Sequence, residues 1–276
     1  MTTETDTTRL ALRILQGTTL EDKLAAFDPA LLVDGVPLPA VPPREPGRAP
    51  SLRIISQGER LPRPGQLTAA AARAECLHRF ANHELQALEL MAWAVLAFPA
   101  MPWSFRQGIM NNLHDEQRHF RLYLGRLAAH GLRFGDLACN GNFWAQAVRL
   151  GDPLAFLCAV GLTFETANLD FALLYRDAFR TAGAEAEASV MQRIHDDEVG
   201  HVAWSASWVR RLARPAETLL QAYQRVTPFP LGLHRAKGRN FVVSSRVRAG
   251  LEADFVEATR VARSPQEQHP RRGRPG

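Results

Sequence analysis

Beyond residue 66, hydrophobic positions recur at helical spacing, and almost no stretch shows the two-residue alternation of a half-buried strand. Four long helices are predicted, over about residues 67–98, 103–130, 153–181 and 185–212. Prolines bracket a short connection at 99–102, residues 131–152 make a long one, and Gly183 marks another short one. This order of connections is that of a four-helix bundle with one crossover. The predicted fold class is therefore all-α.

The segments that flank these helices have a different character. Two short helices are predicted within residues 8–27, and nine prolines follow between residues 29 and 66, which is typical of an extended segment. Further helices are expected near 216–225 and 243–262. The predicted organisation has four parts: an N-terminal region of short helices and Pro-rich chain (1–66), the bundle (67–213), a helical extension that packs on the bundle (214–262) and a disordered basic tail (263–276).

Acidic residues stand on the apolar faces of the four long helices. At 100° per residue, Glu84 falls in the middle of the apolar stripe of the first helix. The second helix turns Glu116 and His119 inward, and the fourth does the same with Glu198 and His201. The third helix is apolar on nearly all sides around Glu165. Because a lone buried carboxylate is costly, these side chains are expected to share a purpose.

Four inward carboxylates, two of them followed three residues later by an inward histidine, form the ligand set of a dinuclear metal site within a ferritin-like bundle. Two ions about 3.5–4 Å apart need bridging and terminal oxygen donors, and the i, i+3 spacing offers a carboxylate and an imidazole to one ion. The first two glutamates are 32 residues apart and the last two 33, so the helix pairs keep one register. We therefore predict metal ligation by Glu84, Glu116, His119, Glu165, Glu198 and His201.

Other polar residues of these helices receive different predictions. On the first helix, the face opposite Glu84 carries Glu75, His78, Asn82, Gln86 and Glu89, and we expect it to be solvated or covered by a terminal segment rather than to bind metal. Asp115 and Asp197 each stand four residues before a ligand histidine. They are predicted to accept its second N–H, with a helical ion or hydrogen-bond pair as the alternative.

Two residues beside the predicted ligands are candidates for further roles. Tyr123 lies four residues after His119 on the inward face, from which a phenol can be oxidised, but a core tyrosine with a hydrogen-bonded hydroxyl is the favoured interpretation. Ser205, one turn after His201, is small enough for the open side of the site.

The five tryptophans are expected to pack between helices, with a substrate pocket or a homodimer contact as alternatives.

Composition limits the class of protein. The 276 residues are 46% hydrophobic and 22% charged, enough for a buried core. Three distant cysteines without a CxxC exclude a disulfide scaffold and a thiolate metal site, and they favour the cytoplasm. No signal peptide or uninterrupted apolar stretch of membrane-spanning length is recognised, so no membrane association is expected. The net charge of +5 arises from the C-terminal region, mainly from Arg235, Lys237, Arg239, Arg246, Arg248 and the arginines after residue 262.

Several stretches of the sequence resemble known proteins. DEQRH at 115–119 resembles the DExRH box of bacterial diiron monooxygenases, whereas DEVGH at 197–201 departs from it at Gly200. Together with ANHELQALELMAWAVLAFP, LTFETANLDF and HRAKGRNF, these motifs resemble a family of bacterial ferritin-like proteins of unassigned function. Within that superfamily the chain is similar to the tRNA 2-methylthio-isopentenyladenosine hydroxylase. The resemblance covers about residues 67–258 and implies an O2-activating diiron centre on the six residues above.

Three classes of function agree with these observations. The favoured one is an oxygenase or hydroxylase that uses two Fe ions, or Mn and Fe, with O2 as co-substrate and an external electron donor such as a reductase partner. Its substrate is expected to be a small molecule or, from the resemblance, a tRNA that the basic C-terminal region could bind. The favoured interpretation of that region is that its inner cluster packs on the mildly acidic bundle and that its Arg-rich tail is a solubilising end. The alternatives are ferritin-like iron handling or peroxide removal, and a binding or structural bundle that the metal merely stabilises.

Overall fold

The computed structural model describes residues 4–35, 42–55, 61–228 and 230–264. Helices dominate these ranges, and within them no strand forms; two isolated bridges, Asp6 with Val33 and Ile54 with Cys139, are the extended pairings found there. The predicted all-α class is thus confirmed. The chain divides into two compact units, one of residues 1–153 and 175–191 and the other of residues 154–174 and 192–276.

The long helices lie where the hydrophobic pattern predicts them. They comprise α3 (Ala70–Ala97), α4 (Trp103–Ala129), a third helical rod and α8 (Glu185–Leu212). The third rod consists of α6 (Pro153–Ala159), a π-helical segment η4 (Val160–Glu165) and α7 (Thr166–Thr181). The order of short, long and short connections agrees with the prediction, although the long one contains a helix that the pattern did not reveal, α5 (Asn142–Ala147).

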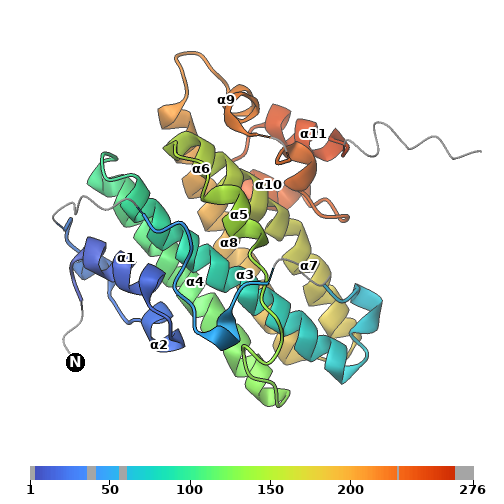
Figure 1. Ribbon diagram of the computed structural model, residues 1–276. Coiled ribbons are helices and arrows are strands. Elements are labelled where there is room, and N and C mark those ends of the chain that lie inside the picture. Colours follow the sequence, from blue (N-terminus) through green and yellow to red (C-terminus); the bar gives the residue numbers. More distant parts are fainter. Residues whose placement is uncertain (1–3, 36–41, 56–60, 229, 265–276) are drawn as a thin grey trace, which may run out of the picture. The chain divides into compact units, whose positions relative to one another are not determined.

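The first unit is built on α3 and α4, which pack against each other in opposite directions because only five residues connect them (Figure 1). The N-terminal helices α1 (Thr7–Gln16) and α2 (Leu20–Lys23) lie on α3. The Pro-rich segment is interrupted by three single 3₁₀ turns, η1 (Pro29–Leu31), η2 (Pro50–Leu52) and η3 (Pro64–Gln66). This segment is therefore part of the folded structure in the ranges described.

The N-terminal region covers the polar face of α3. Glu89 is completely buried, with Lys23 Nζ 3.0 Å and Arg48 Nη2 2.6 Å from its carboxylate oxygens. Lys23 also donates to the carbonyl oxygens of Ile14 and Leu15, so its ammonium group has several partners. The prediction that a terminal segment covers this face is therefore confirmed at Glu89.

The connection between α4 and α6 contacts three more residues of that face. His78 Nε2 accepts a hydrogen bond from the backbone of Gly135, and Asn82 donates to the backbone of Asn140. Gln86 Oε1 accepts from the backbone N–H of Phe143. Buried side chains of α3 thus provide hydrogen-bond partners for the backbone of a loop that has little regular structure of its own.

The second unit contains the C-terminal helices α9 (Leu219–Val226), α10 (Val243–Arg248) and α11 (Ala253–Val261). The single helix predicted over 243–262 is wrong in this respect: Gly250, at φ +69°, ends the first half, and α11 begins three residues later. The α9 helix begins at a capping box of Thr218 and Gln221. The predicted disordered tail lies outside the described residues from 265 onward.

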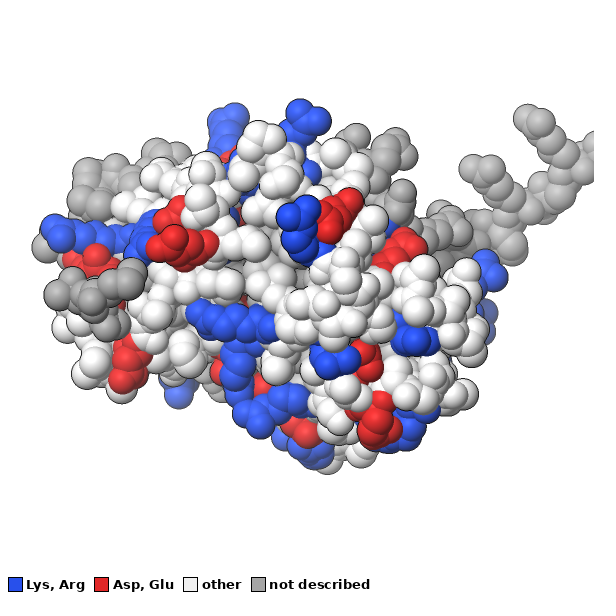
Figure 2. All heavy atoms as spheres, turned by 90° about the horizontal axis from the view of Figure 1, so that it is seen from below, with Lys and Arg blue, Asp and Glu red and all other residues white. Residues whose placement is uncertain are grey.

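The burial of the most apolar helix and the charges on the surface both bear on the class of protein. The rod Pro153–Thr181 is long and apolar enough to cross a membrane, but 72% of its most apolar window is buried within the structure, as in the core helix of a soluble protein. On the face drawn in Figure 2, basic and acidic side chains are interspersed. A soluble protein is consistent with both observations, and the cytoplasmic location remains a prediction.

Candidate metal centre

In the first unit, α3 and α4 bring three of the predicted ligands together. His119 Nδ1 lies 3.6 Å from Glu84 Oε2 and 3.6 Å from Glu116 Oε2. All three side chains are buried, with residue exposures of 4% for Glu84, 1% for Glu116 and 0% for His119. Two carboxylates and an imidazole therefore turn their donor atoms toward one point inside the protein.

The electrostatics of this arrangement favour a cation. Burial raises the pKa of Glu84 well above its ordinary range, and the negative charge of Glu116 raises it further. Hydrogen bonding and charge from His119 act in the opposite direction but are weaker. A metal ion among these groups would favour the ionised form of Glu84.

In the second unit, α8 and the π-helical segment supply the other three predicted ligands. His201 Nδ1 lies 3.6 Å from Glu198 Oε2, which repeats the spacing found on α4. Glu165 ends the π-helical segment and is 6% exposed. Glu198 Oε1 accepts a hydrogen bond from Asn168 Nδ2 at 2.9 Å, whereas its buried Oε2 accepts none within the described part of the chain. A buried carboxylate oxygen left in this way is suited to a metal ion.

The local backbone explains how Glu165 is presented. Thr163 Oγ1 donates to the carbonyl of Cys158, and Thr166 Oγ1 to that of Gly161, in both cases five residues back. The i, i+5 period of a π-helix places these hydroxyls over those carbonyls, and such segments are frequent at functional sites. Gly161 lets Ser205 approach closely, because a Cβ at this position would overlap the Ser205 side chain.

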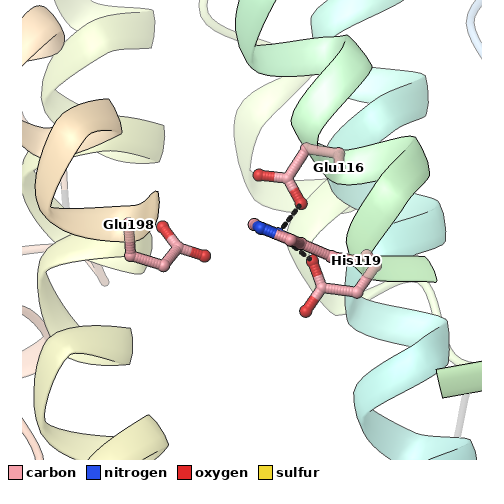
Figure 3. Close-up of side chains that lie close together, drawn as sticks. Glu116, His119 and Glu198 are labelled. Atoms are coloured by element: carbon pink, nitrogen blue, oxygen red, sulfur yellow. Dashed lines mark ion pairs between the residues drawn. The ribbon is translucent and has the colours of Figure 1, made fainter. Parts of the chain in front are cut away.

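Two overlapping groups of buried donor atoms could each hold a metal ion. In the first, one ligand atom from each of Glu84, Glu116, His119 and Glu198 lies within 4.8 Å of the others. In the second, the same holds for Glu116, Glu165, Glu198 and His201. Figure 3 shows the side chains of Glu116, His119 and Glu198 lying close together. These buried carboxylate and imidazole clusters contain all six residues predicted as ligands, and they can hold a metal ion.

The other predicted residues have these surroundings. Asp115 pairs with Arg118 at 2.6 Å and Asp197 with Arg193 at 3.3 Å, which are helical ion pairs; their bonds to the ligand histidines stay a prediction. Tyr123 is buried, and its hydroxyl lies 3.2 Å from Met191 Sδ, as expected of a core tyrosine. Ser205 is buried against Gly161.

Two features of the site were not predicted from the sequence. The first is Asn168, which holds Glu198 and stands three residues after Glu165, the same spacing as glutamate and histidine on α4 and α8. That spacing was a signal that could have been used. The second is the π-helical turn, which has no counterpart in a count of apolar residues at a period of 3.6.

Comparison with known proteins identifies a family. A family model described as "Protein of unknown function (DUF455)" matches residues 7–257. No curated protein and no solved structure matches the chain significantly. The matched range includes the N-terminal helices, all six predicted ligands and nearly all of the C-terminal helices.

Proposed function

The chain belongs to the DUF455 family of proteins of unknown function, and we propose that it is an O2-activating protein with a dinuclear non-haem iron or manganese–iron centre that oxidises an organic substrate. One observation carries this proposal. Glu116 and Glu198 belong to both groups of donors, whereas Glu84 with His119 and Glu165 with His201 each belong to one. The two carboxylates common to both groups could serve two ions, and each ion would also have a carboxylate and an imidazole of its own.

The chemistry of the donors supports two divalent ions of the iron and manganese class. Four carboxylates carry enough negative charge to balance two divalent cations, and the two neutral imidazoles add none. Structural zinc sites instead favour four cysteine or histidine ligands in one tetrahedron. A ligand set rich in oxygen, with one nitrogen for each ion, fits iron or manganese. When bound, such ions supply the redox chemistry that activates O2.

The surrounding residues of this chain would orient the donors and exclude water. Asn168 holds one oxygen of Glu198 and leaves the other available for an ion. Phe80, stacked on Tyr123 with ring centroids 5.8 Å apart, contributes to the apolar core of the first unit and stands four residues before Glu84 on α3. Electrostatic interactions are strong where water is excluded, which stabilises bound cations among the four carboxylates.

The proposed partners follow from what the sequence contains. The sequence has neither a CxxC pair nor a GxGxxG motif, so electrons for repeated turnover would come from a reductase partner. The substrate is proposed to be a small organic molecule or a tRNA. A homodimer remains a prediction.

Metal analysis of the purified protein tests the proposal. After reconstitution with Fe(II) without oxygen, the wild-type chain should contain about two metal ions, the number that a dinuclear site requires. Glu165→Ala and His201→Ala should lower this number, and Glu116→Ala should lower it most because its carboxylate belongs to both groups. The matched control is Glu75→Ala, whose carboxylate on α3 pairs with Arg79 and is 37% exposed.

The outcomes separate the proposal from its alternatives. Full metal content in Glu165→Ala would overturn the assignment of ligands. Incorporation of hundreds of iron ions per assembly in air would indicate iron storage instead. A higher melting temperature with Fe(II) but no O2 consumption would indicate a metal that only stabilises the bundle.

A further inference from the structure

The π-helical segment determines where Glu165 points. A π-helical turn contains one more residue than an α-helical turn, and each added residue rotates the helix by about 100°. If Val160–Glu165 relaxed to an α-helix, the direction of Glu165 relative to α6 would change by a comparable angle. Something in the second unit must therefore hold this turn in its π-helical form.

Tyr223 of α9 contacts the turn two residues before Glu165. Its hydroxyl oxygen lies 2.6 Å from Thr163 Oγ1, and both side chains are buried. Thr163 donates its own hydrogen to the carbonyl of Cys158, so the hydrogen between the two hydroxyls belongs to Tyr223. The ring of Tyr223 is fixed in turn by Phe255, in an edge-to-face contact with centroids 5.4 Å apart.

Arg246 of α10 contacts the chain directly after Glu165. Its guanidinium forms two bonds to Asp170, of 2.7 and 2.8 Å, and a longer one of 3.4 Å to the carbonyl of Thr166. The backbone N–H groups of Gly238 and Val242 also donate to the Asp170 carboxylate. One carboxylate on the first turns of α7 thus connects the segment 238–246 to the end of the π-helical turn.

Both contacts come from the C-terminal extension, and they lie on either side of Glu165. We propose that Tyr223 and Arg246 are positioning residues, which hold the π-helical turn and thereby direct Glu165 toward a metal ion. The inference rests on the proposed dinuclear centre. It assigns the C-terminal extension a role in metal binding that does not require it to touch the metal.

Titration with Co(II), whose visible absorption reports its coordination, tests this role. The variants are Tyr223→Phe and Arg246→Lys, and the matched controls are Tyr175→Phe, a buried tyrosine that donates to the carbonyl of Pro62, and Arg225→Lys, which pairs with Glu217. Tyr223→Phe should weaken binding of one of the two ions about 10-fold, the effect of losing a supporting hydrogen bond. Its Co(II) spectrum should change, whereas both controls should retain the wild-type spectrum.

A second pair of variants separates positioning from general stability. Thr163→Val removes the hydroxyl that Tyr223 contacts and should reproduce the loss of affinity, whereas Thr163→Ser retains the hydroxyl and should restore it. The melting temperature of the metal-free protein is measured for every variant. Tyr223→Phe and Tyr175→Phe are compared under conditions in which both lose the same number of degrees in melting temperature. If Tyr223→Phe then binds both ions as tightly as Tyr175→Phe does, the proposed positioning role is wrong.

Hydrogen exchange without metal keeps this inference distinct from the proposed function. Tyr223→Phe should speed amide exchange in residues 160–166, and Tyr175→Phe should not. A wild-type chain that binds no metal would overturn the proposed function, and with it the part of the inference that concerns metal. Unchanged exchange in Tyr223→Phe would overturn the claim that this residue holds the turn.

Discussion

Arg246 and Asp170 form an ion pair in which both side chains are completely buried, with two N–O distances of 2.7 and 2.8 Å. The ring of Phe241 lies against the guanidinium, 3.9 Å from ring centroid to Cζ. The sequence places Arg246 in a basic stretch that was predicted either to contact phosphates or, as the favoured interpretation, to pack on the bundle. In the structure its charge lies inside the protein, paired with Asp170.

Removal of one partner of this pair should be strongly destabilising. Arg246→Ala leaves the Asp170 carboxylate buried with two backbone N–H donors and no balancing charge. A loss of about 3–5 kcal/mol in the free energy of unfolding is expected, measured by urea denaturation of the metal-free protein. Arg248→Ala is the control, because that side chain is 57% exposed and 3.5 Å from Asp196; its loss should be at most about 1 kcal/mol. Equal losses would show that the buried pair contributes little.

The stability of the protein should fall with acid partly because of His78. Burial, and then the positive charge of Arg79, lower the pKa of His78 to about 4 from its ordinary value of 6.5. Between these values the unfolded chain binds a proton that the folded chain does not, so stability is lost as the pH falls from about 6.5 to about 4. Protonation would also remove the acceptor of the Gly135 N–H.

His78→Gln isolates this contribution, because the amide oxygen can still accept a hydrogen bond and does not titrate. The slope of unfolding free energy against pH near pH 5 should be smaller in the variant by up to about 1.4 kcal/mol per pH unit, the value for one proton. Both proteins are measured with a chelator, so that metal release does not contribute. Burial also lowers the pKa of His83 to about 4, so some dependence on pH should remain. Identical slopes would contradict the role of His78.

The sequence predicted the helices and the donor set because both depend on local periodicity. Glu84 and Glu165 are conspicuous since each stands among apolar residues at helical spacing. The π-helical turn is an insertion of one residue and leaves that average period nearly unchanged. The burial of Glu89 was not specified by α3 alone, because its partners come from distant parts of the chain, Lys23 from the end of α2 and Arg48 from the Pro-rich segment.

Gly161 should tolerate no larger side chain while Ser205 is present. A Cβ at Gly161 would overlap the Cβ and Oγ of Ser205 in a buried site. Gly161→Ala should therefore lower the free energy of unfolding by about 1–3 kcal/mol, the usual cost of overpacking, and reduce the metal content. Adding Ser205→Gly should recover most of the loss.

The control for this prediction is Gly125→Ala on α4. Nothing lies within 4 Å of a Cβ at Gly125, so alanine should stabilise the helix by about 0.4–1 kcal/mol. Failure of Ser205→Gly to rescue Gly161→Ala would show that backbone conformation, rather than contact with Ser205, requires the glycine.

Reaction with O2 should depend on an added reductant. The Fe(II)-loaded protein should consume O2 once in proportion to its iron and then stop, because the sequence has no motif for a second redox cofactor. Adding a chemical reductant should restore consumption, as measured with an oxygen electrode. His201→Ala should react more slowly, and Glu75→Ala should behave as wild type. Sustained consumption without reductant would contradict a requirement for an external donor.

The substrate class can be tested through the basic C-terminal region. With Arg246 buried, phosphate contacts would fall to Arg235 and Arg239, which are exposed, and to a surface hollow of about 580 Å³ lined in part by Lys237, Arg260 and Arg263. If tRNA binds there, the logarithm of the binding constant should fall with that of the salt concentration, by about 0.7–0.9 for each phosphate contact.

Binding of tRNA is therefore measured at two salt concentrations for the full chain, for a truncation after Ala262 and for Arg235→Ala. Arg235→Ala should reduce the slope by about 1, as expected for the loss of one contact, whereas Arg225→Ala, whose guanidinium pairs with Glu217, should change it less. The truncation should reduce it further if the arginines beyond residue 262 take part. Counterion release favours binding most at low salt. Absence of binding there by the full chain and by the truncation would therefore exclude tRNA as the substrate. A small molecule that reaches the buried carboxylates would then be the substrate class to pursue.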